Sequence, residues 1–159
     1  MAIYPLISAD AINSDKQIKL ELEDVPGLYI DAREINQLIL NMVRNGMESM
    51  EAGGVLTIRT INAENQVILA IEDQGHGIAA DIMDKIGTPF FTTKELGTGL
   101  GLAICYSIAA RNNAAIKVKT NKQGSIFSVV FNTSNAGDDT CKLDALKGIQ
   151  PSGQVHCVS

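Results

Sequence analysis

The chain contains short stretches in which apolar residues alternate with polar ones or β-branched residues dominate, a pattern typical of β-strands. Turn residues separate these stretches into three hairpin-like pairs: 18–23 with 28–30, 55–61 with 67–71, and 116–120 with 125–131. The first pair surrounds the turn at Pro26 and Gly27, and we expect it to form an edge hairpin.

Longer segments place apolar residues at the spacing of an amphipathic helix. The clearest one begins at Asp31, a good N-cap residue, with Glu34 standing where a capping box has its acidic partner, and ends before Gly53. Another spans 100–111. Counting all elements gives about three strand pairs and three helices that do not follow a regular βαβ repeat, which favours an α+β fold, a two-layer sandwich.

The pattern also predicts the domain boundaries. We expect one folded domain over 16–132, preceded by the remains of a linker at 1–15. Residues 133–159 are rich in Gly, Ser, Asp and Lys with little periodicity, so we expect a poorly ordered tail.

Composition narrows the class of protein. The chain has 159 residues, 45% of them hydrophobic and 19% charged, as in a single globular domain. Its apolar runs are shorter than the roughly 20 residues of a membrane span, and its start lacks the features of a secretory signal. We therefore expect a cytoplasmic segment without membrane contact; whether the parent protein is anchored in a membrane is left open.

Charge and cysteine content exclude further classes. The net charge is −5 and the basic residues are scattered, so a nucleic-acid partner is not expected. The three cysteines form no C-x-x-C pair, and with two histidines they favour reduced thiols over a disulfide framework or a zinc site.

Glycine is concentrated between residues 75 and 101, where six glycines and Pro89 argue against a packed element and for a mobile or ligand-facing segment. The spacing is not that of a P-loop: its one approximate match, 148–153, is followed by Gln154 rather than by Lys. The spacing is also tighter than a dinucleotide fingerprint requires, and no βαβ unit surrounds it.

Two polar motifs precede or open this segment. Asn41, Asn45 and Glu48 project from one face of the first predicted helix, where amide oxygens could ligate a hard cation, although a solvated helix face has the same appearance. The second motif, DQGHGI at 73–78, places a carboxylate at a strand end beside two glycines, which an ordinary turn could also do.

Two further motifs follow. PFFTTK at 89–94 combines an aromatic pair with a cation, as expected of a lid or of a loop pinned to the core. GTGLGL at 97–102 leads into a helix N-terminus, whose free N–H groups and dipole favour an anion. Each motif is ambiguous alone, but their order is specific.

These four motifs resemble, in order, the N box, first glycine box, F box and second glycine box of the ATP-binding catalytic domain of bacterial sensor histidine kinases. That domain has the Bergerat fold shared with gyrase-, Hsp90- and MutL-type ATPases. The resemblance covers 18–132 and implies a mixed, mostly antiparallel sheet with about three helices on one face.

The resemblance also implies a nucleotide site. Asn45 would hold a Mg²⁺ ion that bridges the ATP phosphates, and Asp73 would accept a hydrogen bond from the adenine amino group. Asn41 and Asn45 would be the catalytic positions. The ATP-binding residues implied in this way are Asn45, Asp73, Gly75, Gly77, Ile78, Thr93, Lys94, Gly97, Thr98, Gly99, Leu100, Gly101 and Ser125.

One departure from related ATPases bears on the reaction. Hydrolytic relatives and anti-sigma serine kinases have a Glu general base one helical turn before the Mg²⁺-binding Asn, and here that residue is Asn41. An amide cannot take up a proton at neutral pH, whereas a neutral imidazole already carries its lone pair. The resemblance therefore implies transfer of the γ-phosphoryl group of Mg-ATP to a histidine.

The partners follow from the same resemblance. The family's acceptor histidine lies on a long dimerisation helix, which does not precede residue 18, and neither His76 nor His156 is suitably placed. We expect the catalytic half of a two-component kinase, acting on a separate His-bearing dimerisation domain with a response regulator downstream. Two alternatives stay open: a stand-alone ATPase or anti-sigma-type serine kinase, which Asn41 disfavours, and a binding module that has lost catalysis.

Overall fold

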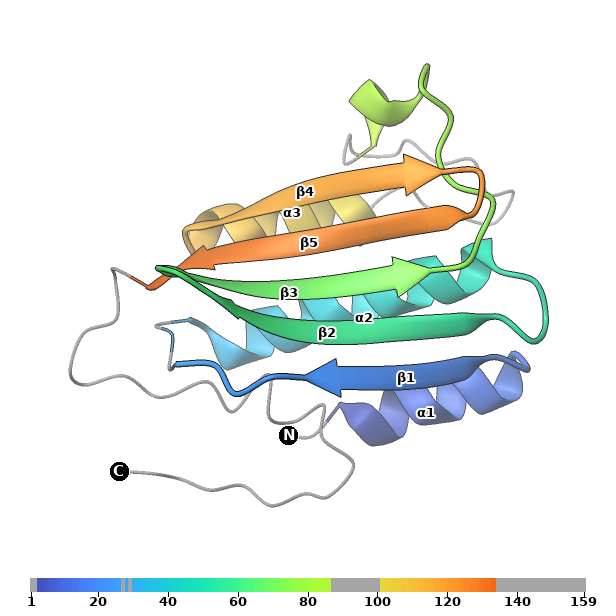
Figure 1. Cartoon of the computed structure of the whole chain (residues 1–159), viewed down its shortest axis with the longest axis horizontal. Helices are drawn as coiled ribbons and strands as arrows, with labels where there is room; N and C mark the ends of the chain where they lie inside the picture. The colour runs from blue at the N-terminus through green and yellow to red at the C-terminus, as the bar shows by residue number, and fades with distance from the viewer. Residues whose placement is uncertain (1–2, 27, 29, 87–100, 134–159) are drawn as a thin grey trace.

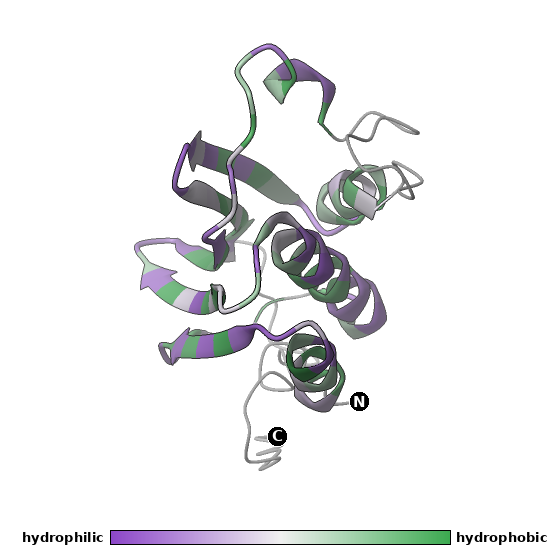
Figure 2. Ribbon diagram, turned by 90° about the vertical axis from the view of Figure 1, so that its right-hand side faces the viewer, coloured by the Kyte–Doolittle hydropathy of each residue, from purple (hydrophilic) through white to green (hydrophobic). Residues whose placement is uncertain are grey.

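The computed structural model describes residues 3–26, 28, 30–86 and 101–133. Three helices, α1 to α3, lie on one face of a five-stranded sheet and leave its other face open (Figures 1 and 2). The elements in chain order are α1 Tyr4–Asn13, β1 Gln17–Leu22, α2 Ala32–Ser49, β2 Val55–Ala63, β3 Gln66–Asp73, a 3-10 turn Met83–Lys85, α3 Gly101–Arg111, β4 Ala114–Asn121 and β5 Gly124–Asn132. The predicted two-layer α+β sandwich is confirmed.

The sheet has the strand order β1-β2-β3-β5-β4. Only β1 and β2 run parallel, and the other neighbouring pairs are antiparallel, as a mixed and mostly antiparallel sheet requires. The predicted hairpins appear as β2–β3 and β4–β5. In β3–β5 the register pairs Asp73 with Ser125, which brings two predicted site residues to the same end of the sheet.

The predicted edge hairpin of 18–23 with 28–30 is wrong. β1 instead pairs in parallel with β2, and the chain between them passes through α2, since parallel neighbours need a crossover. Leu28 is buried in the helix–sheet core, where its side chain is removed from water. Arg59 on β2 supports the observed register because it forms ion pairs with Glu21 on β1 and Glu72 on β3.

The core lies between the helices and the inner face of the sheet. α2 is central: it contacts α1 on one side, α3 on the other and β2 and β3 beneath. Its apolar stripe is fully buried against alternate residues of the strands, which explains the helical spacing read from the sequence. The largest buried side chains are Ile7, Ile35, Leu38, Ile39, Val43, Leu56, Ile58, Leu69, Ile71, Ile108 and Phe131.

The first fifteen residues, expected to be a linker remnant, contain helix α1. Ile7 and Ala11 on this helix are buried in the core, and Arg44 of α2 forms a 2.8 Å ion pair with Asp10. No sequence signal marked the helix, because apolar residues lie on its exposed side as well: Ile12 is 77% exposed. The division into a linker at 1–15, a domain at 16–132 and a tail at 133–159 stays a prediction.

The start of α2 is capped as predicted, although the capping box is not formed. The Asp31 carboxylate accepts hydrogen bonds from the backbone N–H groups of Arg33 and Glu34. The Glu34 carboxylate does not return to the Asp31 N–H. It accepts instead from Arg111 at 2.7 Å and Asn112 at 2.9 Å, and thus ties α2 to the end of α3.

Candidate functional site

The candidate site is centred on Asp73, the last residue of β3, which is only 6% exposed. Its Oδ1 atom accepts hydrogen bonds from the backbone N–H of Gly75 at 2.9 Å and of Ser125 at 3.3 Å. Burial raises the pKa of the Asp73 carboxyl group, and these backbone hydrogen bonds oppose the rise. The result is a buried hydrogen-bond acceptor that is held in one orientation from two sides.

Helix α2 approaches this carboxyl group closely, because its last turns carry small residues. A Cβ atom on Gly46 would lie 2.6 Å from Leu56 Cδ1 and 3.4 Å from Asp73 Cβ, so only glycine fits there without movement. A Cβ atom on Gly75 would lie 2.6 Å from the Ser49 carbonyl oxygen. The Ser49 hydroxyl donates to the Gly46 carbonyl oxygen at 2.8 Å and lies near enough to Asp73 to lower the pKa of its carboxyl group, so α2 contributes a third group to its environment.

The segment after Asp73 lies on the adjoining ends of β4 and β5. Gly77 has a φ of +77°, and a Cβ atom there would overlap the carbonyl oxygen of Asn121, so both conformation and space require glycine. The Ile78 N–H donates to Thr120 Oγ1 at 2.8 Å, and Thr120 Oγ1 lies 2.9 Å from Ser125 Oγ. The glycine segment is therefore attached to the strands that carry Ser125.

The two asparagines of the first motif lie on α2, one turn apart and both half-buried, while Glu48 is exposed. Asn41 lies near Cys105 of α3, where it lowers the pKa of the thiol, and that thiol donates to the Leu38 carbonyl oxygen at 3.6 Å. Burial raises the pKa of Cys105 to about 12, so this thiol is neutral at pH 7. Because Gly46 abuts Asp73, the turn of α2 that carries Asn45 lies beside the carboxyl group.

Residues 30–135 match the family model described as histidine kinase-, DNA gyrase B- and HSP90-like ATPase. The chain belongs to this ATPase family. The match includes all three parts of the site described above: α2, the end of β3 with its glycine segment, and the β4–β5 end.

Proteins named as kinases are among the relatives of this chain, and similar solved structures include histidine kinase domains. Sporulation kinase C of Bacillus subtilis is 35% identical over 132 residues, which cover 81% of this chain and 31% of the relative. The chain thus spans about a third of that protein. The catalytic domain of histidine kinase ThkA, in a nucleotide-free form, superposes with a TM-score of 0.73 at 26% identity, covering 82% of this chain and 87% of that one.

A second similar structure was solved in complex with a nucleotide analogue. Full-length ShkA in complex with AMPPNP has a TM-score of 0.74 and 27% identity, and the match covers 84% of this chain and 29% of ShkA.

Over the stretches that the structure describes, none of the helices has both the length and the hydropathy that a bilayer span requires.

Some of the predicted site residues lie in the part of the chain that the structure describes, and the others lie outside it. The structure brings Asp73, Gly75, Gly77, Ile78 and Ser125 together, and it places Asn41 and Asn45 on the adjacent helix. Gly101 begins α3 and is exposed. The other predicted residues lie outside the described residues: Thr93, Lys94, Gly97, Thr98, Gly99 and Leu100.

Two polar residues of the site, Ser49 and Thr120, were missed by the sequence reading. Ser49 is near the end of a helix and Thr120 near the end of a strand, where single hydroxyl residues are common. Ser49 lies within the N-box stretch 41–50 and Thr120 lies outside all four motifs, and no signal in a single sequence singles out their hydroxyl groups. Only the pairing of β4 with β5 and the close approach of α2 reveal them.

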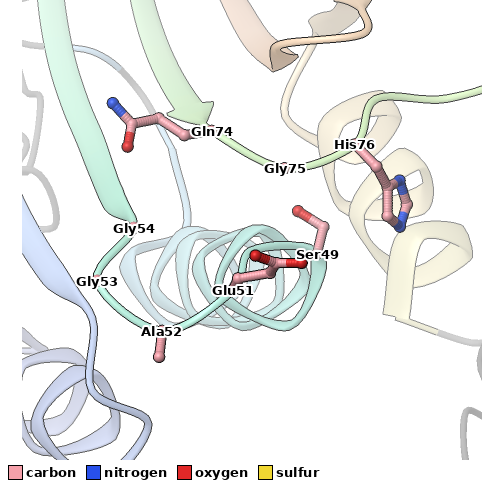
Figure 3. A pocket seen from close by; sticks show the side chains of 8 residues that line it. All are labelled: Ser49, Glu51, Ala52, Gly53, Gly54, Gln74, Gly75 and His76. Atoms are coloured by element: carbon pink, nitrogen blue, oxygen red, sulfur yellow. The ribbon is translucent and has the colours of Figure 1, made fainter.

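A shallow hollow of about 420 Å³ adjoins the site at the C-terminal end of α2 (Figure 3). Ser49 and the segment 74–76 form one wall, and the turn 51–54 forms the other. Gln74 does not reach into the hollow as a free group, because its Oε1 accepts from the Val55 N–H at 3.0 Å. Asp73 does not line the hollow, which we therefore treat as a neighbour of the site.

Proposed function

We propose that this chain binds Mg-ATP and donates the γ-phosphoryl group to a histidine on a separate dimerisation domain, as the catalytic part of a two-component kinase with a response regulator downstream. The observation that carries the proposal is the Asp73 environment: a buried carboxylate with one oxygen fixed by two backbone N–H groups, at the sheet end where the glycine segment and α2 meet. Family membership and kinase relatives support it.

Asp73 suits the recognition of adenine. Its Oδ1 is occupied by backbone donors, and an ionised carboxylate keeps acceptor capacity on its other oxygen. The exocyclic amino group of adenine is a donor at the position where guanine has a carbonyl oxygen. A fixed acceptor would therefore bind adenine and repel guanine, since an unmatched buried acceptor loses its partner.

The donor set fits a Mg²⁺ ion that is held mainly by its substrate. The described residues contain no cluster of three or more acidic, histidine or cysteine side chains that could hold a metal. Mg²⁺ in nucleotide sites commonly keeps waters and binds one or two protein oxygens plus phosphates. Asn45 would supply an amide oxygen, and the bound ion would neutralise phosphate charge.

Catalysis would rest on positioning. The histidine nitrogen would use its lone pair to attack the γ-phosphorus while the bond to the β–γ bridging oxygen breaks and ADP leaves. No protein base is needed for that attack. Asn41 is consistent with this chemistry because its side chain carries no titratable group.

The proposal is tested by mixing the chain and Mg-ATP with candidate His-bearing dimerisation domains. Transfer of labelled γ-phosphate to the added domain, as acid-labile phosphohistidine, is expected. Asn45→Ala should abolish transfer, whereas Gln37→Ala, an exposed amide on the same helix, should leave it unchanged. Acid-stable phosphate on a serine of an added protein would instead support a serine kinase and contradict the proposal.

A further inference from the structure

Thr120 is a half-buried residue near the end of β4 whose hydroxyl group contacts three polar groups, one after β3 and two on β5. It accepts a hydrogen bond from the Ile78 N–H at 2.8 Å and lies 2.9 Å from Ser125 Oγ. The Gly124 carbonyl oxygen is 3.4 Å away and is a second possible acceptor for its proton. One side chain thus joins the segment after β3 to both strands of the β4–β5 hairpin.

These contacts form a closed path around Asp73. The Ser125 backbone N–H donates to Asp73 Oδ1, and the Ser125 hydroxyl meets Thr120. Thr120 in turn holds Ile78, which lies five residues after Asp73 along the chain. Gly77 rests directly on the Asn121 carbonyl group, so the glycine segment has no room to settle closer to the strands. Its position is therefore set by contact on one side and by the Thr120 hydrogen bond.

The proton count of the hydroxyl adds a second effect. A threonine hydroxyl has one proton and two lone pairs, and the Ile78 N–H uses one lone pair. If the proton goes to Ser125 Oγ, the Ser125 hydroxyl keeps its own proton for a ligand or a water molecule. If the proton goes to the Gly124 carbonyl, Ser125 must donate to Thr120. Thr120 therefore determines what the Ser125 hydroxyl can offer.

We propose that Thr120 is a positioning residue of the adenine pocket: it fixes the segment 75–78 and the Ser125 hydroxyl around Asp73 without touching the nucleotide. The inference rests on the proposed function, because it assumes that Asp73 receives adenine. The contacts of Thr120 lie at the base end of such a pocket, so the residue acts on the nucleoside and not on the phosphates.

The test compares Thr120→Val, which removes the hydroxyl at nearly constant volume, with Thr120→Ser, which keeps it. Isothermal titration should show that Thr120→Val weakens ATP and ADP by the same factor, about tenfold, as expected for losing a buried hydrogen bond. Thr120→Ser should stay within about twofold of the wild type. Hydrogen exchange of the Ile78 amide should accelerate in the valine variant and return to the wild-type rate in the serine variant.

Thr60→Val is the matched control. Thr60 is a buried threonine of β2 whose hydroxyl donates to the Glu23 carbonyl oxygen at 2.9 Å, a bond of the same kind away from Asp73. It should lower the melting temperature and leave nucleotide affinity unchanged. Thr120→Val with wild-type affinity for both nucleotides would reduce Thr120 to a structural role and overturn the inference. If the valine variant does not fold, Thr120→Ala is titrated instead and judged by the same criteria.

The wild-type titration separates this inference from the proposed function. A folded wild-type chain that binds no adenine nucleotide would overturn the proposed function and this inference together. Wild-type binding with no loss in Thr120→Val would overturn the inference alone.

Discussion

At the scale of single residues, Asp73 shows how a site can oppose stability. Burial raises its pKa in the folded chain above the value of about 3.9 that an exposed aspartate has. The folded state therefore binds the proton more tightly than the unfolded state does. Folding is favoured at low pH by this group, and that contribution is lost as the pH rises from the unfolded pKa through the raised folded pKa. At pH 7 the buried, charged carboxylate therefore lowers the stability of the fold, and a functional role of Asp73 would explain why it is kept.

Asp73→Asn should weaken nucleotide binding without destabilising the nucleotide-free fold. Affinity for ATP should fall by about 1.5–3 kcal/mol, since a charge-assisted acceptor is lost. The melting temperature of the nucleotide-free chain at pH 7 should not fall, because the buried charge is removed. Titration calorimetry and thermal unfolding measure the two effects. Glu72→Gln on the same strand, whose carboxylate pairs with Arg59, is the control for charge loss and should not change affinity. Unchanged ATP affinity in Asp73→Asn would remove Asp73 from the proposed site.

At the scale of elements, the sequence identified the strands and the two longest helices but not all their neighbours. The period of two in β1 marks a strand, yet it carries no information on its partner, so the parallel pairing with β2 was missed. α1 was missed because its exposed side is also apolar, with Leu6 45% exposed. The family resemblance implied that Asp73 and Ser125 belong to one site, whereas the place of Ser49 and Thr120 beside them could be recognised only from the tertiary structure.

The bridge between the helix ends shows how α2 is held against α3. Asn112, just after α3, accepts from the Asp31 N–H at 2.9 Å and donates to Glu34 at 2.9 Å and to the Ile108 carbonyl at 2.8 Å. Glu34 also accepts from Arg111. The Asp31 N–H, which a capping box would satisfy within α2, is satisfied by the other helix instead. The two helices that carry the predicted Mg²⁺-binding and triphosphate-binding residues are thereby joined.

Asn112→Ala should therefore destabilise the fold by about 1–3 kcal/mol, because it removes three hydrogen bonds and leaves the Asp31 N–H without its partner. The unfolding midpoint in urea measures the loss. Asn13→Ala, at the exposed end of α1, is the matched control and should change the free energy of unfolding by less than about 0.5 kcal/mol. A midpoint for Asn112→Ala equal to that of the control would show that the bridge contributes nothing measurable.

At the scale of the whole molecule, the polar groups of the site come from three different parts of the fold. The carboxylate lies on β3, the two asparagines lie on α2, and the groups that hold the glycine segment lie on β4 and β5. In the proposed function this arrangement binds and orients the nucleotide, and Asn41 occupies the position one helical turn before Asn45 where hydrolytic relatives are expected to have a Glu general base. Its chemistry then depends on what the partner supplies.

The isolated chain should accordingly bind Mg-ATP without turning it over. An amide at position 41 cannot deprotonate water, so phosphate release should stay near the rate of a blank, and the chain should not label itself when incubated with γ-labelled ATP. Asn41→Glu introduces a carboxylate at this position and should raise phosphate release above the wild-type level; Asn41→Gln is its neutral control. Phosphate turnover is measured as the release of labelled phosphate from ATP, and self-labelling as the label that stays on the purified chain. Asn45→Ala is run in parallel to expose contaminating ATPases. Robust turnover by the wild-type chain that disappears in Asn45→Ala would establish a stand-alone ATPase and contradict phosphoryl transfer to histidine as its reaction.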